Sequence, residues 1–157
     1  MVSSRRNTPE RQRFEALFTG MEPKLRAVYD RMHKQEMAYR EQLFNRYTSF
    51  LINGIPDSRG RSVATGVARG WMREKQIFAF HHRRHYHFPS FQFSAGEPKP
   101  VVGKALALMN PDDGWHAMFW FVGANGWLEA GAPVEILDAD PRAVLEAAMH
   151  ANDEISD

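Results

Sequence analysis

Four of the chain's seven histidines lie within seven positions, and a pair of arginines stands among them. The histidines are His81, His82, His85 and His87. Imidazole is a common metal ligand and acid–base group, so such a cluster could bind a divalent cation. However, Arg83 and Arg84 would repel that cation, and no carboxylate lies between residues 75 and 96. We therefore expect no metal and no cofactor, and we favour a basic loop that contacts phosphates over a merely solvated loop.

The sequence around this cluster predicts a helix followed by a β-hairpin. Apolar residues at helical spacing predict a helix over residues 62–75, with Ser62 as its N-cap. Two β-like runs, 76–80 and 86–93, flank the polar His-Arg loop. A helix followed by a two-stranded wing is typical of winged helix-turn-helix domains, and Arg69 is the first candidate for a base contact. The predicted DNA-binding residues are Arg61, Ser62, Thr65, Arg69, Arg73, Lys75, Arg83 and Arg84.

Charge divides the chain into two parts. Residues 1–90 carry 17 Lys and Arg against 8 Asp and Glu, whereas residues 91–157 carry 3 against 11. A basic surface attracts polyanions such as nucleic acid, and an acidic surface repels them. The alternative is that two oppositely charged faces attract each other. No apolar run approaches the ~20 residues needed to cross a bilayer, and the chain has no cysteine, so we expect a cytoplasmic protein with no membrane partner.

The periodicity predicts a mainly α fold in three parts. Residues 1–20 are polar and predict a flexible tail with about one helical turn. Residues 21–95 form the basic, winged-helix-like part, which opens with one amphipathic helix or a pair over residues 22–52. The aromatic-rich stripe of that segment suits its own core or a homodimer. Residues 96–157 predict an acidic, Trp-containing helical domain. Its helices are expected over residues 101–110, 115–122, 133–137 and 142–150.

The run SVATGVARGWMREKQIFAFHHRRHYHFPSFQF and the Trp-rich stretch after it resemble the MbcA/Xre/ParS-like antitoxins over roughly residues 60–150. The residues that carry the downstream match are Trp115, Trp120, Asn125, Trp127, Leu128, Gly131, Pro133, Leu137, Asp140, Pro141, Ala147 and Ala148. The resemblance implies a mostly helical fold, with a C-terminal toxin-binding domain that blocks a RES-domain toxin which degrades NAD. It also implies that the complex binds its own promoter. Residues 1–55 do not align with the family's usual helix-turn-helix.

Together these features predict an antitoxin of a type II toxin–antitoxin system, which neutralises its toxin by direct binding and binds operator DNA. The alternative is a stand-alone DNA-binding transcriptional regulator without a toxin. Three tryptophans within thirteen residues are more than one short helix needs for its core, and Trp127, in a Gly-flanked turn, is expected to be the most exposed. The predicted toxin-binding residues are Trp120, Asn125, Trp127, Leu128, Asp153, Glu154 and Asp157. No motif of nucleophilic, phosphate-binding or metal-dependent catalysis is present, so we do not expect an enzyme.

Overall fold

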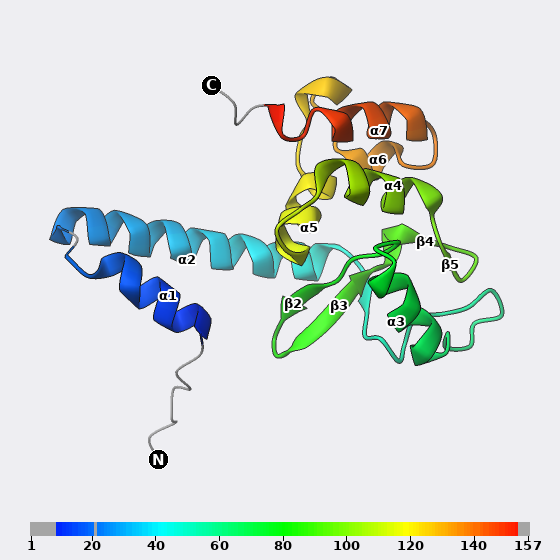
Figure 1. Ribbon diagram of the computed structural model, residues 1–157, viewed down its shortest axis with the longest axis horizontal. Helices are drawn as coiled ribbons and strands as arrows, with labels where there is room; N and C mark the ends of the chain where they lie inside the picture. Colours follow the sequence, from blue (N-terminus) through cyan, green and yellow to red (C-terminus); the bar gives the residue numbers. More distant parts are fainter. Residues whose placement is uncertain (1–8, 21, 154–157) are drawn as a thin grey trace, which may run out of the picture. The chain divides into compact units, whose positions relative to one another are not determined.

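The computed structural model describes residues 9–20 and 22–153, and most of its regular structure is helical (Figure 1). The mainly α fold class is therefore confirmed. The chain divides into two units, residues 1–45 and residues 46–157. The first unit contains α1 (Pro9–Phe18) and nearly all of α2 (Pro23–Arg46). The second contains a small sheet, α3 and a set of C-terminal helices.

Both helices of the first unit begin at a proline, whose fixed φ and missing N–H suit the first helical turn. α1 extends over ten residues, which is longer than the single turn that the polar composition predicted. Residues 1–8 of the predicted tail lie outside the described residues. The predicted helix over 22–52 is wrong at its C-terminal end, because α2 stops at Arg46. The following residues extend into β1 (Ser49–Phe50), which pairs with a strand distant in sequence.

The small sheet has the strand order β1-β3-β2, with β2 at Phe80–His82 and β3 at His85–Pro89, and both pairings are antiparallel. Phe80 pairs with His87 and His82 with His85, so Arg83 and Arg84 alone form the turn. The predicted strand bounds, and the five-residue loop predicted over residues 81–85, are therefore wrong. Alternation along the hairpin places Phe80, His82, His85 and His87 on one face.

Residues 77–79 are buried before β2 begins, and a side chain replaces a strand partner there. The amide of Gln92, in the short helix η1 (Ser90–Gln92), is completely buried. The N–H of Phe78 donates to Gln92 Oε1 at 2.9 Å, and Gln92 Nε2 donates to the Phe78 carbonyl at 2.8 Å. Because a primary amide offers a donor and an acceptor side by side, it satisfies both backbone groups of a residue that no strand pairs. A second hairpin, β4 (Phe93–Ser94) and β5 (Glu97–Pro98), follows.

α3 (Thr65–Arg73) packs on the sheet through an apolar cluster. The cluster contains Ile55, Ala68, Ile77, Ala79 and Phe88, with Phe50, Ile52, Val63, Trp71, Met72 and Phe93 packed against it. The predicted helix start at Ser62 is wrong. Ser62 forms a β-bridge with Pro56, and the Asp57 carboxylate accepts hydrogen bonds from the backbone N–H groups of Arg59 and Arg61. This turn keeps the backbone extended at residue 62, so α3 begins three residues later without a side-chain cap.

Four C-terminal helices form within a residue or two of the predicted bounds, and they are α4 (Pro100–Met109), α5 (Gly114–Val122), α6 (Pro133–Ile136) and α7 (Pro141–Met149). A short helix that was not predicted, η2 (Gly126–Leu128), lies between α5 and α6. Asp113 and Asp140 cap α5 and α7 by accepting backbone N–H bonds. α4 packs against α7 (Figure 1). The side chains of Val102, Met118 and Phe121 are buried. Gly114 permits α5 to approach the preceding chain, because a Cβ there would overlap the Ala79 carbonyl oxygen.

Candidate functional site

A groove of about 880 Å³ lies between α3, the residues after β1 and the β2–β3 hairpin. We call it the basic groove, and it is lined by Leu51, Ile52, Asn53, Thr65, Arg69, Met72, Arg73, Arg84, His85, Tyr86 and Phe88. Its lining holds three arginines and no carboxylate. Because nothing in the lining offsets these cations, the groove is suited to a polyanion.

α3 supplies one wall of the basic groove. Thr65, Arg69 and Arg73 are spaced one helical turn apart, so their side chains emerge on the same face. Ala68, on another face, is fully buried in the apolar cluster, which fixes the rotation of the helix about its axis. Both arginines are exposed. The helix therefore presents two long cationic side chains to solvent from a packed support.

The hairpin turn supplies the opposite wall, and its backbone is unusual. Arg83 and Arg84 have φ values of 50° and 70°, the two positive values of a type I′ turn, which normally selects Asn and Gly. The left-handed conformation costs a residue with a Cβ about 1 to 2 kcal/mol. Such strain concentrates at functional sites, where the side chain is needed more than the relaxed backbone. Arg84 lines the basic groove, and Arg83 does not.

The structure thus gathers four of the predicted DNA-binding residues and separates the others. Arg61 and Ser62 belong to the Asp57-anchored turn and do not line the basic groove. Lys75 lines another hollow of about 490 Å³, which it shares with Glu74 and Glu97. His85 and Tyr86 complete the basic groove, although sequence reasoning did not select them. Successive residues of a strand point to opposite faces, so the sequence would not have placed His85 and Tyr86 in the same groove. Both line the basic groove because they lie next to the turn of the hairpin.

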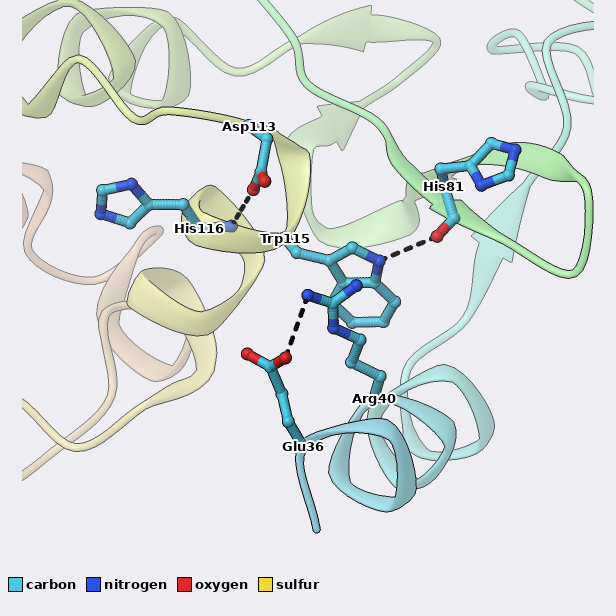
Figure 2. A network of polar contacts seen from close by, with 6 residues as sticks. All are labelled: Glu36, Arg40, His81, Asp113, Trp115 and His116. Atoms are coloured by element: carbon cyan, nitrogen blue, oxygen red, sulfur yellow. Dashed lines mark hydrogen bonds and ion pairs between the residues drawn. The ribbon is translucent and has the colours of Figure 1, made fainter. Parts of the chain in front are cut away.

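The part of the hairpin that bears Phe80 and His82 packs on α5. The Trp115 ring lies 4.6 Å from that of Phe80 and 5.9 Å from that of His82, measured between centroids. Its indole N–H donates to the carbonyl oxygen of His81 at 2.8 Å, which occupies a backbone acceptor of the edge strand β2 (Figure 2). In the part of the chain that the structure describes, no group of three His, Asp or Glu could hold a metal ion.

The surroundings of His87 on β3 shift the pKa of its imidazole. Burial lowers the pKa of His87, and the neighbouring His82, His85 and His81 lower it further, although the hydrogen bond with the His82 backbone opposes them. That bond joins His87 Nε2 to the His82 carbonyl oxygen at 2.9 Å. The neutral ring, protonated on Nε2, is therefore the form that the fold stabilises. Arg83 and Arg84 give the turn of the hairpin a permanent positive charge.

A second surface lies at the far end of α5. Trp127 of η2 is 53% exposed, although His150 stacks on one face of its ring at 3.8 Å between centroids. His150 Nδ1 is in turn held by the Asp153 carboxylate at 2.6 Å. We call this arrangement the Trp127 surface. Trp115 is buried and Trp120 half-buried, so the expectation that Trp127 is the most exposed of the three is confirmed.

The other predicted toxin-binding residues that the structure describes lie at or beside the Trp127 surface. Trp120, Asn125, Trp127 and His150 line one hollow of about 150 Å³, and Leu128 follows Trp127 in η2. Asn125 caps η2 by accepting the Trp127 backbone N–H at 2.9 Å. Glu154 and Asp157 lie outside the described residues. Sequence reasoning missed His150, whose role depends on a stacking contact across 23 positions.

No helix within residues 9–20 and 22–153 combines the length and the apolarity that crossing a bilayer requires. No protein-family model, curated protein or solved structure matches this chain.

Proposed function

We propose that this protein is a DNA-binding antitoxin. In this proposal the basic groove contacts operator DNA, and the Trp127 surface binds a toxin of the RES-domain, NAD-degrading class. The observation that carries the DNA-binding part is the convergence of Arg69, Arg73 and Arg84 in a lining without a carboxylate. The toxin-binding part is supported by the resemblance over roughly residues 60–150 and by an exposed, positioned tryptophan in an acidic half of the chain.

The proposed DNA contact follows the logic of a helix and wing. α3 would present Arg69 to a base edge in the major groove, because bidentate arginine to guanine is the commonest specific contact. Arg84 on the turn would contact a phosphate beside it. Tyr86, which is 61% exposed, offers an aromatic edge between them. The winged-helix arrangement is part of this proposal. A helix-turn-helix would need a helix before α3, and no helix lies within residues 51–64.

Fluorescence anisotropy tests the DNA-binding part. The probes are a labelled duplex from the promoter of the protein's own gene and a scrambled duplex of equal length. We expect promoter affinity at least ~10-fold higher, and we expect Arg69→Ala to reduce that ratio towards one. Arg142→Ala, an exposed arginine of α7 outside the groove, is the matched control and should leave the ratio unchanged. Equal affinities for both duplexes in the native protein would refute operator binding.

Co-expression tests the toxin-binding part. A RES-domain toxin encoded beside this gene should deplete cellular NAD alone and should be silenced when this protein is co-expressed. Trp127→Ala should weaken the purified complex by at least ~30-fold, since an interface hot spot contributes about 2 kcal/mol or more. Leu108→Ala, an exposed apolar residue of α4, serves as the control. Unchanged affinity in Trp127→Ala would exclude this surface.

The second candidate function is a stand-alone transcriptional regulator. The basic groove supports a regulator as well as it supports an antitoxin, because DNA binding does not require the Trp127 surface. Retained operator binding in a protein that fails to silence any neighbouring toxin would select this alternative over the antitoxin.

A further inference from the structure

The basic groove also carries apolar side chains that phosphates do not use. Leu51 is 41% exposed and Tyr86 is 61% exposed, and both line the groove. Ile52 and Met72, which also line it, are half-buried, and Phe88 is buried. A phosphate gains nothing by covering apolar surface, whereas exposed apolar side chains gathered in one hollow usually mark an interaction site. The groove therefore suits a ligand that has an apolar part as well as an anionic part.

The size of the basic groove restricts what that apolar part can be. Its volume of about 880 Å³ lies within the range of pockets that enclose a small molecule. The bases of a paired duplex stack on one another and offer a protein only their edges. An unpaired base instead offers flat faces, which proteins cover with aromatic side chains. The groove therefore fits a nucleotide whose base is not paired.

The three arginines indicate that the ligand carries more than one anionic group. Arg69 and Arg73 stand one turn apart along α3, a separation of about 6 Å along the helix axis. Arg84 lies on the hairpin turn, which forms the opposite wall of the groove. One bidentate guanidinium satisfies a single carboxylate or phosphate. Cations on both walls favour successive phosphates of one nucleic-acid strand over a small amphiphilic monoanion.

Tyr86 is the aromatic residue of the groove with the most exposed surface for stacking. It pairs with His81 in the β2–β3 register, and the two rings make an edge contact at 5.1 Å between centroids, with 72° between their planes. This contact supports the Tyr86 ring, and its exposed fraction leaves area for a base. A tyrosine has only two side-chain torsions, so little conformational entropy is lost when a base stacks on it.

We propose that the basic groove holds a DNA strand with an unpaired base, which stacks on Tyr86 while the surrounding arginines contact the flanking phosphates. The inference rests on the proposed DNA-binding function and adds that the bound strand is locally single. The apolar side chains of the groove then cover the base, and the cations face the strand on both sides. Binding therefore depends on the presence of bases as well as on charge.

Fluorescence anisotropy with two strands of equal length and charge tests this inference. The probes are a labelled oligothymidine and an abasic strand, which has the same phosphates and no bases. We expect the oligothymidine to bind at least ~10-fold more tightly, because each base stacked on an aromatic ring contributes to affinity. Equal affinities would overturn the inference. An oligouridine should bind no more tightly than the oligothymidine, and ~10-fold tighter binding would overturn DNA as the ligand.

These probes fail independently of the promoter duplex that tests the proposed function. A native protein that prefers the promoter duplex but binds the oligothymidine and the abasic strand equally would overturn this inference alone. A native protein that prefers the oligothymidine to the abasic strand, but binds promoter and scrambled duplexes equally, would overturn operator binding alone.

Substitutions of Tyr86 separate stacking from a structural role. Tyr86→Leu should weaken oligothymidine binding by at least ~5-fold and leave the affinity for the abasic strand unchanged. Tyr86→Phe keeps the ring and should bind both strands as the native protein does. Trp127→Leu, which removes an exposed aromatic side chain outside the groove, is the matched control and should change neither affinity. Equal losses for both strands in Tyr86→Leu, or no loss for either, would refute the stacking contact.

Photo-cross-linking locates the base directly. An oligothymidine that contains 5-iododeoxyuridine should cross-link on irradiation to the aromatic ring on which the base stacks. Mass spectrometry of the digested native protein should find the modification on Tyr86. Modification confined to aromatic residues outside the basic groove, such as Trp127, would overturn the proposed site.

Discussion

Replacing Arg84 by glycine should stabilise the protein and weaken its binding to DNA at the same time. Arg84 has a φ of 70°, which glycine adopts without a Cβ penalty of about 1 to 2 kcal/mol. Glycine loses about 0.5 to 1 kcal/mol more backbone entropy on folding, so the net gain is about 0.5 to 1 kcal/mol. For a unit of residues 46–157 this raises Tm by about 2 to 4 °C.

The DNA effect of the same change has the opposite sign. Arg84 lines the basic groove, and removal of one phosphate contact should reduce the slope of log affinity against log salt by about 0.9. Differential scanning calorimetry measures the first effect, and anisotropy over a series of salt concentrations measures the second.

A matched substitution separates backbone relief from lost charge. Ala95 has a φ of 51° in the turn between β4 and β5, and its side chain is exposed and uncharged. Ala95→Gly should therefore raise Tm by a similar amount without changing DNA affinity. If Arg84→Gly lowers Tm, or if both glycine variants bind DNA as the native protein does, the argument that a functional arginine is kept in a strained turn is wrong.

Three further predictions concern the support of the groove and the hairpin. Gln92→Ala should destabilise by about 2 to 5 kcal/mol in urea unfolding, because it leaves the buried N–H and carbonyl of Phe78 without partners. Gly114→Ala should cost several kcal/mol and disorder the hairpin by NMR, since its Cβ overlaps the Ala79 carbonyl, whereas Gly126→Ala should be tolerated. The contribution of His87 to the free energy of unfolding should be complete above pH 6.5, the pKa of the unfolded imidazole. It should decrease as pH falls from 6.5 through the lowered pKa of His87 in the folded protein, because the unfolded chain then binds the proton more tightly. His87→Gln should reduce this pH dependence of urea midpoints, and an unchanged profile would contradict the assignment.

Local signals in the sequence located the C-terminal helices well. Pro100, Pro133 and Pro141 stand in the first turns of their helices, and Asp140 caps α7. These signals succeed because capping and proline geometry act within four residues. The helix-then-hairpin order was also predictable, since periodicity changes from helical to strand-like between residues 73 and 80.

The features that were predicted wrongly from the sequence depend on contacts between distant residues. β1 has only two residues, which is too short for an alternation pattern, and it exists because Phe50 pairs with Phe88. The observed strands lie nearer to the hairpin tip than the predicted ones. The reason is that the Gln92 amide forms hydrogen bonds with the backbone of Phe78, and Trp115 packs on Phe80. The register of the hairpin in turn decides which arginine faces α3. Half of the predicted DNA-binding residues meet in the basic groove, and their role in binding DNA stays a prediction.

The most direct test of the central claim is the salt dependence of DNA binding for the native protein and for a variant with Arg69, Arg73 and Arg84 all changed to alanine. If the basic groove binds phosphates through these three residues, the slope of log affinity against log salt should become shallower by about 2.7 in the triple variant. Arg142→Ala should retain the native slope. A triple variant whose slope and affinity match those of the native protein would show that the basic groove does not bind DNA.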